Sequence, residues 1–450
     1  MTATSTDYTA EDPRNILAQR PMAAFQFGIV AVMFCLNGLD GFDVLAISFA
    51  APGITSQWGV SAQALGVVIS VGLLATGLGS LFVAPFADRI GRRPMILLSL
   101  AAMSVGMVMS AAATGVTSLS AGRIVTGLGV GALVPCISAL TAEYCNQHYK
   151  DFGVIIMAIG FPVGGLVGGQ VAALLLHHFD WHAVFVAGAL ASGAMTLLAL
   201  WLVPESIEYL LLRKPVRGLE RVNAILSRLR QPLVRVLPAS DANAKSPSVL
   251  DIFIRPALLA IAIIFTFAYG LHGATLYYTL NWIPKIVVDL GLSQPQGAAV
   301  AGWCSGGGIL GSVLAAWLAT RMQIRLLTVA ALFGTSLSLV LFAHMPGEFA
   351  ALTCNSLLVG AFLYGAQVSL YALMTRSFPV HVRATGVGFV TGVGRLGGII
   401  SPLLSGHLLQ LGLPYSEVSN FMALGSALSA VVLLLTSRQQ RSVLPSVVES

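Results

Sequence analysis

Twelve runs of apolar residues, each long enough to cross a lipid bilayer, dominate this sequence of 450 residues. A helix needs about 20 apolar residues to span the hydrocarbon core of a membrane. The predicted spans are 22–50, 63–86, 94–113, 117–142, 152–175, 182–203, 256–283, 296–319, 324–344, 348–374, 384–409 and 417–436. We therefore predict an all-α polytopic membrane protein of twelve transmembrane helices in two six-helix halves.

The charge content supports a membrane protein over a soluble one. Only 9% of the residues are charged, whereas an ordinary soluble protein has about 25%. The net charge of +6 comes from basic residues that lie between the apolar runs, so we expect no nucleic-acid partner. The five cysteines are scattered and form neither a disulfide framework nor a metal-ligand spacing. We expect no metal and no cofactor.

The positions of the basic residues predict the topology. With the N-terminus in the cytoplasm, only Arg123, Lys285 and Arg395 of the 24 lysines and arginines lie well inside a span or outside the cell. The others lie in or beside the predicted cytoplasmic segments, as the positive-inside rule requires. We predict a multi-pass inner-membrane protein, monomeric, with both termini in the cytoplasm. Its predicted regions are an N-terminal tail (1–21), an N-terminal bundle (22–203), a linker that is partly helical (204–255), a C-terminal bundle (256–436) and a C-terminal tail (437–450).

Glycine is concentrated in the predicted spans, with 47 residues in the chain. Small residues let transmembrane helices approach closely, and this packing role accounts for most of them. Smooth glycine faces would also let two halves rock against each other during alternating access. The sequence alone does not separate the two roles.

Two acids stand in the first predicted span, where the sequence reads DGFD over residues 40–43. Asp40 and Asp43 are three residues apart and therefore share one face of a helix. Ionisable groups are costly in hydrocarbon and usually serve a function there. An acid that exchanges protons near neutral pH suits proton coupling, so we predict that role for both. The alternative is that they form salt bridges to neighbouring helices, for example to Arg123.

Two arginines are the basic counterparts of these acids. Arg395 lies roughly 16 Å into its span, near the bilayer midplane. A guanidinium keeps its charge and binds carboxylates through two hydrogen bonds, so we predict that Arg395 anchors an anionic substrate. The alternative is a structural partner to a buried acid. Arg123 lies nearer the end of its helix, where its side chain could reach water, and is a second candidate for the anion.

Aromatic and amide side chains are candidates for the rest of a substrate site. Tyr364, Gln367 and Tyr371 recur at helical spacing and share one face of the tenth span. The seventh span adds Asn281 beside several aromatic residues, of which Tyr277, Tyr278 and Trp282 stand near the predicted membrane interface. Such a wall suits a flat, ring-shaped ligand. Aromatic belts at the interface explain the last three residues equally well.

The loop after the second span reads APFADRIGRR over residues 84–93. Asp88 can pair with an arginine or with the positive end of a neighbouring helix. Such a charged clasp would hold one conformer and release in another. We predict that Asp88, Arg89 and Arg92 act in gating.

This loop resembles the G-x-x-x-D-R-x-G-R-R/K signature of the major facilitator superfamily, with Ala84 in place of the first glycine. The sequence RIVTGLG over 123–129 is similar to the fourth-span motif of that superfamily, and PES over 204–206 closes the sixth span as in many members. The equivalent loop of the second half, around Thr320 and Arg321, lacks the aspartate.

The DGFD sequence, followed by Ala51 and Pro52, resembles the first span of the aromatic acid:proton symporters within this superfamily, the 4-hydroxybenzoate and benzoate type of transporter. The resemblance extends through Glu143, NWIP over 281–284 and RATGVG over 383–388. It implies proton-coupled uptake of a small aromatic carboxylate. It also implies functional roles for these residues: Asp40, Asp43, Asp88, Arg123, Glu143, Arg383 and Arg395, with Glu143 and Arg383 in gating.

Other solutes remain possible at this stage. An aliphatic organic acid would use the same arginine, whereas a sugar site would use amides and few charges. The glycine-rich fifth span keeps drug–proton antiport open. A nutrient-sensing receptor is a remote alternative. The sequence has no metal cluster, nucleophile elbow or phosphate loop, and we do not expect an enzyme.

Overall fold

The computed structural model describes residues 8–9, 12–238, 256–379 and 382–435. Within them, twelve helices are long and apolar enough to cross a membrane, which confirms the predicted number. They are α2 (Ala24–Trp58), α3 (Ala62–Leu78), α5 (Arg92–Ala111), α6 (Val116–Tyr144), α7 (Lys150–His178), α8 (His182–Leu202), α12 (Pro256–Asp289), α13 (Gln294–Leu318), α14 (Ile324–Ala343), α15 (Phe349–Ser377), α16 (Arg383–Gln410) and α17 (Tyr415–Leu435). A π turn (Gly79–Val83), a 3-10 turn (Ala84–Phe86) and α4 (Ala87–Ile90) extend α3.

Two helices run well past their predicted ends, and each of them continues through a proline. Helix α2 continues through Pro52 to Trp58, and α12 continues through Pro284 to Asp289, where the sequence predicted ends at 50 and 283. Proline breaks helices in water, but in a membrane protein the neighbouring helices and local side chains compensate for the lost backbone hydrogen bond.

The first six spanning helices and the last six form two halves with the same internal pairing. Helix α2 packs on α7 as α12 packs on α16, and α3 packs on α6 as α13 packs on α15. Glycines line these pairs. A Cβ at Gly164 would meet the backbone of Gly38, and one at Gly311 would meet the backbone of Ala361. Most glycines of the spans thus serve close packing within a half.

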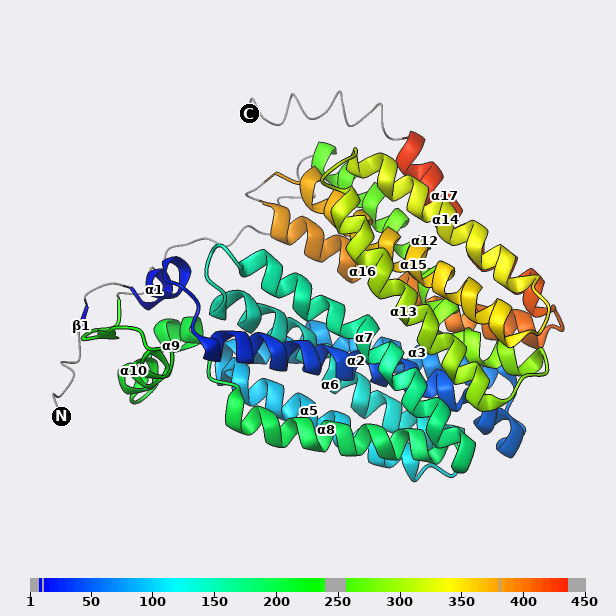
Figure 1. The fold of residues 1–450 in the computed structure, drawn as a ribbon, viewed down its shortest axis with the longest axis horizontal. Helices are drawn as coiled ribbons and strands as arrows, with labels where there is room; N and C mark the ends of the chain where they lie inside the picture. The colour runs from blue at the N-terminus through cyan, green and yellow to red at the C-terminus, as the bar shows by residue number, and fades with distance from the viewer. Residues whose placement is uncertain (1–7, 10–11, 239–255, 380–381, 436–450) are drawn as a thin grey trace.

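Among the described residues, the apolar contacts between the halves lie toward one end of the molecule. One hydrophobic core joins residues of both halves, whereas two others each lie within a single half. Figure 1 shows the helix axes of the two halves inclined to each other and converging on the side away from α1 (Pro13–Gln19). We call the end where α2 ends and α3 begins the contact end, and the opposite end the separated end.

A smaller set of glycines lies between the halves at the contact end. A Cβ at Gly169 on α7 would meet Gly302 on α13, and a Cβ at Gly66 on α3 would meet the carbonyl oxygen of Pro402 on α16. These pairs place backbone directly against backbone across the interface. These glycines also serve close packing, here between the halves, and a role in rocking stays a prediction.

The chain before α2 and the chain after α8 pack together at the separated end. Helices α1, α9 (Ile207–Arg213) and α10 (Gly218–Arg228) share one hydrophobic core, with Ile16 and Leu210 wholly buried in it. Strand β1 (Tyr8–Thr9) pairs in parallel with β2 (Leu233–Val234). The linker is thus partly helical as far as residue 238, and the predicted C-terminal tail (437–450) lies outside the described residues.

Candidate functional site

Asp43 on α2 and Arg123 on α6 form a buried ion pair inside the first half. Arg123 donates from Nη1 to Asp43 Oδ1 and from Nη2 to Asp43 Oδ2, each at 3.2 Å, and Nη2 also donates to the Asp43 carbonyl oxygen at 3.1 Å. The two residues are 1% and 5% exposed. Arg123 therefore does not extend to water. In this conformer Asp43 has the helix-bridging contact that the sequence left open as an alternative.

Asp40 lies one helical turn before Asp43 and has a different environment. It is buried, and its Oδ1 has no hydrogen-bond partner among the described residues. Asp40 is close enough to Arg395 of the other half to interact with it electrostatically. A carboxylate between two halves, with an unsatisfied oxygen and a nearby cation, is able to bind and release a proton.

Arg395 on α16 stands between two tyrosines of α12. The rings of Tyr269 and Tyr277 lie against α16 where Gly394 and Gly398 leave room for them, one on each side of Arg395. Without side chains at those glycines, the two rings pack directly against the α16 backbone beside Arg395.

Arg395 also faces the first half of the molecule. A small cavity between the halves is lined by Arg395 and Tyr277 on one side and by Leu73 and Thr76 of α3 on the other. The guanidinium is therefore at the boundary between the halves, where a ligand would contact both. The site combines a fixed cation, a buried acid and aromatic walls.

The three residues on the tenth-span face lie at different depths. Tyr364 is 7% exposed, with its ring against Gly308 of α13 and 6.5 Å from the ring of Phe161 of the other half. Gln367 is half-buried and neighbours Tyr269. Tyr371 is 48% exposed. Tyr364 and Gln367 are thus near the Arg395 group, while Tyr371 extends toward the separated end.

Asn281 takes part in the contact between the halves. Its Oδ1 accepts a hydrogen bond from Ser48 Oγ of α2 at 2.9 Å, and its Nδ2 donates to the carbonyl oxygen of Tyr277 at 2.7 Å. Tyr278 and Trp282, for which an interfacial belt was an alternative, are wholly buried in the core shared by both halves. Helix α12 continues beyond these residues, so they lie deeper than the sequence indicated.

The loop after α3 belongs to a charged network at the separated end. Arg92 forms an ion pair with Glu143, and its Nη2 lies 3.6 Å from Glu208 Oε2. Ser206 Oγ donates to Glu143 Oε2 at 2.7 Å, and the Arg93 backbone N–H donates to Glu205 Oε1 at 3.1 Å. The network connects α5, α6 and α9 and stays within the first half.

Of the remaining predicted gating residues, Asp88 and Arg89 lie at the rim of this network, whereas Arg383 belongs to the second half. Asp88 is exposed, and its carboxylate makes no ion pair with the residues that the structure describes. Its carbonyl oxygen accepts a hydrogen bond from Arg213 Nε at 2.9 Å, and that of Arg89 accepts one from the Tyr209 hydroxyl at 3.3 Å. Arg383, at the start of α16, is exposed and donates from Nε to the Phe378 carbonyl oxygen at 3.3 Å. The acid of the loop is therefore unpaired in this conformer.

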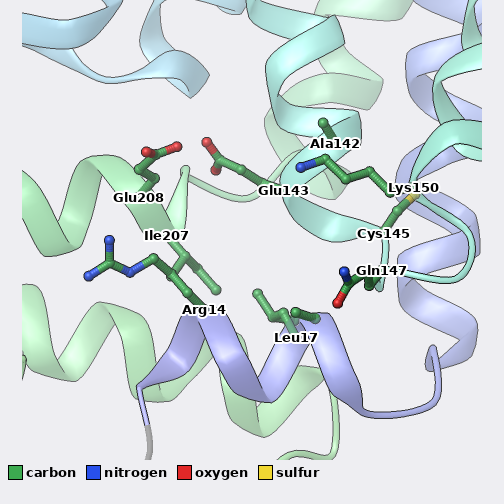
Figure 2. A pocket seen from close by; sticks show the side chains of 10 residues that line it. Arg14, Leu17, Ala142, Glu143, Cys145, Gln147, Lys150, Ile207 and Glu208 are labelled. Atoms are coloured by element: carbon green, nitrogen blue, oxygen red, sulfur yellow. The ribbon is translucent and has the colours of Figure 1, made fainter. Parts of the chain in front are cut away.

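A cavity of about 330 Å³ also lies at the separated end, between α1, α6 and α9. Figure 2 shows Glu143 and Glu208 along one edge of it, with Arg14 and Lys150 on other sides. Its charges are of both signs, and Glu143 and Glu208 already neighbour Arg92. The cavity is lined by the first half and the segments packed on it, so it is separate from the Arg395 group.

His272, the buried histidine of α12, is held by two hydrogen bonds. Its Nδ1 lies 2.9 Å from Ser426 Oγ, and its Nε2 lies 3.2 Å from the carbonyl oxygen of Leu363. A carbonyl only accepts, so Nε2 carries the proton and Nδ1 accepts from the serine. His272 connects α12 to α15 and α17 and is not part of the Arg395 group.

The sequence placed Tyr269 and Tyr277 among the aromatic residues of the seventh span without connecting them to Arg395, and Ser305 was not predicted. Tyr269 and Tyr277 flank Arg395, and Ser305 of α13 neighbours the Tyr364 hydroxyl. The sequence did contain a signal for the tyrosines, because their spacing of eight residues places both on one face of a helix. Gly394 and Gly398, four residues apart around Arg395, likewise share one face of their helix. No local signal marks Ser305, since buried serines are common in membrane helices.

Residues 33–402 match the family model described as Major Facilitator Superfamily. The chain is 30% identical to a gallate transporter of Pseudomonas putida, over 97% of each chain. It is 32% identical to the 4-hydroxybenzoate transporter PcaK of Pseudomonas aeruginosa, over 94% of this chain and 95% of that one. A benzoate transport protein of Acinetobacter baylyi is 27% identical, over 90% and 87%.

Solved structures show the same fold at lower identity. A D-xylose–proton symporter superimposes with a TM-score of 0.70 at 16% identity, covering 91% of this chain and 97% of that one. A point mutant of the nucleoside transporter NupG superimposes with a TM-score of 0.71 at 14% identity, covering 92% and 100%.

Proposed function

This chain belongs to the major facilitator superfamily of transporters, and on that premise we propose that it imports a small aromatic carboxylate together with protons across the inner membrane. It is a multi-pass membrane transporter and not an enzyme. Substrate class, proton coupling and direction are the proposed parts.

The position of Arg395 is the observation that carries the proposal. A fixed positive charge at the boundary between two membrane-embedded halves needs a negative partner, and a carboxylate fits its planar fork. Tyr269 and Tyr277 on either side provide aromatic faces for a ring. The gallate, 4-hydroxybenzoate and benzoate named for the relatives are all carboxylates on an aromatic ring, which supports the same class for this chain.

Asp40 would link the substrate to the proton. Before an anion binds, the charge of Arg395 would offset part of the cost of burying an ionised Asp40 at the boundary. A substrate carboxylate bound to Arg395 brings a second negative charge, and like-charge repulsion then favours the protonated acid. Binding of the anion and uptake of a proton would thus reinforce each other.

Asp43 is the second proposed proton carrier, with a different constraint. Its two oxygens are both engaged by Arg123, so it gains a proton only when that ion pair opens. Arg123 is proposed as a second binding residue for the anion, again only when its ion pair with Asp43 opens. The pair joins α2 to α6, and its opening would accompany a change in the shape of the first half.

The separated end is proposed to face the cytoplasm. The basic linker helices and α1 lie there, and cytoplasmic loops of membrane proteins are rich in lysine and arginine. The described conformer is then open toward the inside of the cell. In the opposite conformer this end closes, and Asp88, Arg89, Arg92, Glu143 and Arg383 are the residues proposed to hold it.

Equilibrium binding to Arg395 variants tests the proposal. Arg395→Lys keeps the charge but loses the planar fork, and Arg395→Ala loses both. Losing a buried charge-assisted pair costs about 2–5 kcal/mol, or roughly 30-fold to several thousand-fold in affinity. The amide of a good substrate should bind the wild type as poorly as the acid binds Arg395→Ala. Folded variants that bind the acid as tightly as the wild type would remove Arg395 from the site.

A further inference from the structure

The small cavity between Arg395 and α3 of the other half has a definite size. Its volume is about 10 Å³, at the lower limit for holding a single water molecule. One oxygen atom of a carboxylate is similar in size to a water molecule, so the cavity has room for one such oxygen and nothing wider. Its lining residues come from both halves: Leu73, Thr76, Tyr277, Arg395, Gly398 and Ile399.

Close packing holds the walls of this cavity in place. The ring of Tyr277 lies against Gly398, where a Cβ would come within 2.3 Å of the ring carbon Cδ2. Helix α3 has no space to retreat from α16, because its other face is in backbone contact with α6. A Cβ at Gly127 of α6 would lie 2.5 Å from the carbonyl oxygen of Gly72. The size of the cavity is therefore set by the α3 side chains that line it.

Leu73 and Thr76, the two α3 residues of the lining, offer different chemistry. Leu73 is buried and apolar, and its branched side chain fills space that a ligand would otherwise occupy. Thr76 Oγ1 donates to the carbonyl oxygen of Gly72 at 3.1 Å. That oxygen also accepts a backbone hydrogen bond within the helix, so the hydroxyl can turn toward an anion and leave it satisfied. An anion at Arg395 would thus meet both a donor and a steric limit on α3.

We propose that this cavity seats one oxygen of the substrate carboxylate, with Arg395 and Thr76 as its donors and Leu73 as the limit on its size. The inference rests on the proposed function, because it takes Arg395 as the anchor of an aromatic acid. It adds two specificity-determining residues from the first half. The substrate carboxylate is then held by both halves at once.

Such a seat discriminates between anions of equal charge. A carboxylate is planar and has two oxygens, whereas a sulfonate carries the same single charge on a tetrahedral group with three oxygens. When one oxygen is seated, the third oxygen of a sulfonate has no space beside Leu73. The transporter should therefore reject aromatic sulfonates, although the guanidinium of Arg395 could pair with either group.

Equilibrium binding of matched carboxylates and sulfonates tests the size limit. Benzoate, benzenesulfonate, 4-hydroxybenzoate and 4-hydroxybenzenesulfonate are titrated into the purified wild type, Leu73→Ala and Leu73→Val. The wild type should bind each carboxylate more tightly than its sulfonate by roughly 5- to 150-fold, the scale of overpacking. In Leu73→Ala this ratio should fall toward one, because the sulfonate gains affinity. Leu73→Val removes less of the side chain, disturbs the fold less, and should give an intermediate ratio.

Thr76 variants test the donor. Thr76→Val keeps the shape of the side chain but loses the hydroxyl, so both carboxylates should bind roughly 10- to 150-fold more weakly, the scale of a hydrogen bond to a charged group. Thr76→Ser keeps the hydroxyl and should bind them nearly as the wild type does. Carboxylate affinity that is unchanged in Thr76→Val would contradict the proposed donor.

Leu74→Ala is the matched control for the size limit. Leu74 follows Leu73 on α3 but is 44% exposed and lies outside the lining of the cavity. Its carboxylate-to-sulfonate ratio should equal that of the wild type. A wild type that binds the sulfonates as tightly as the carboxylates, or Leu73 variants with an unchanged ratio, would overturn the seat. A wild type that binds neither carboxylate would instead contradict the proposed function itself.

Discussion

The two ends of the molecule are built from different interactions. At the contact end the halves meet through neutral groups: Ser48 donates to Asn281, and Gln170 donates to the carbonyl oxygen of Ala299 at 3.3 Å. Glycines on α3 and α7 let backbones touch there. At the separated end the described ion pairs, such as Arg92–Glu143, lie within the first half.

This difference shows how one structure can support two conformers. Neutral hydrogen bonds and glycine contacts can separate without leaving a charge buried and unpaired, which would be strongly unfavourable. The charged residues of the separated end are near water, so they can exchange partners as the halves approach. Opening at the contact end and clasping at the separated end are then parts of one rocking movement.

The largest effect is expected from a bulky side chain placed between the two halves at the contact end. In Gly169→Leu, the new side chain would meet the backbone of Gly302 across the interface. Overpacking typically costs about 1–3 kcal/mol, which shifts the equilibrium against the described conformer by roughly 5- to 150-fold. Transport should fall strongly, and a cysteine placed at buried Leu65 in a cysteine-free background should react faster with an impermeant thiol reagent.

Gly28→Leu provides the control, since a Cβ at Gly28 has no described neighbour within 4 Å. It should transport and label like the parent protein. Unchanged labelling and transport in Gly169→Leu would mean that the contact end is not required to close as described.

A smaller effect is expected at the separated end. Asp88 is exposed and unpaired here, so Asp88→Asn should leave the described conformer intact and weaken only the clasped one. An exposed ion pair contributes about 1 kcal/mol at most, so turnover should slow by roughly fivefold with substrate affinity little changed. Asp151→Asn, at another exposed acid of the same end, is the control. A large loss of equilibrium binding with normal exchange rates would contradict a clasp.

Much of the fold could be predicted from the sequence because membrane spans have a strong local signal. Twelve runs, the division into halves and the fold class all followed from length and hydropathy. The ends of α2 and α12 were missed because the spans were set by the length of the apolar runs, whereas both helices continue through Pro52 and Pro284. The sequence also could not indicate at which end the halves touch, since that depends on contacts between distant segments.

The candidate site was predicted less completely. Ionisable residues in hydrocarbon are conspicuous, so Asp40, Asp43, Arg123 and Arg395 could be singled out from sequence. Their pairing could not: Asp43 binds Arg123 while Asp40 neighbours Arg395, although the two acids stand one turn apart. Tyr277 was ambiguous because an aromatic residue near a span end suits both a lipid interface and a binding site. Only the packing of α12 on α16 resolves it.

Uptake into membrane vesicles tests the central claim, proton-coupled import of an aromatic acid, most directly. Vesicles containing the wild type or Asp40→Asn are given a labelled hydroxybenzoate and a pH gradient, with and without a protonophore. The account predicts that the wild type accumulates the acid, that the protonophore abolishes accumulation, and that Asp40→Asn reaches the membrane at normal levels yet does not accumulate the acid. Wild-type accumulation that persists with the protonophore, or that requires sodium, would contradict it.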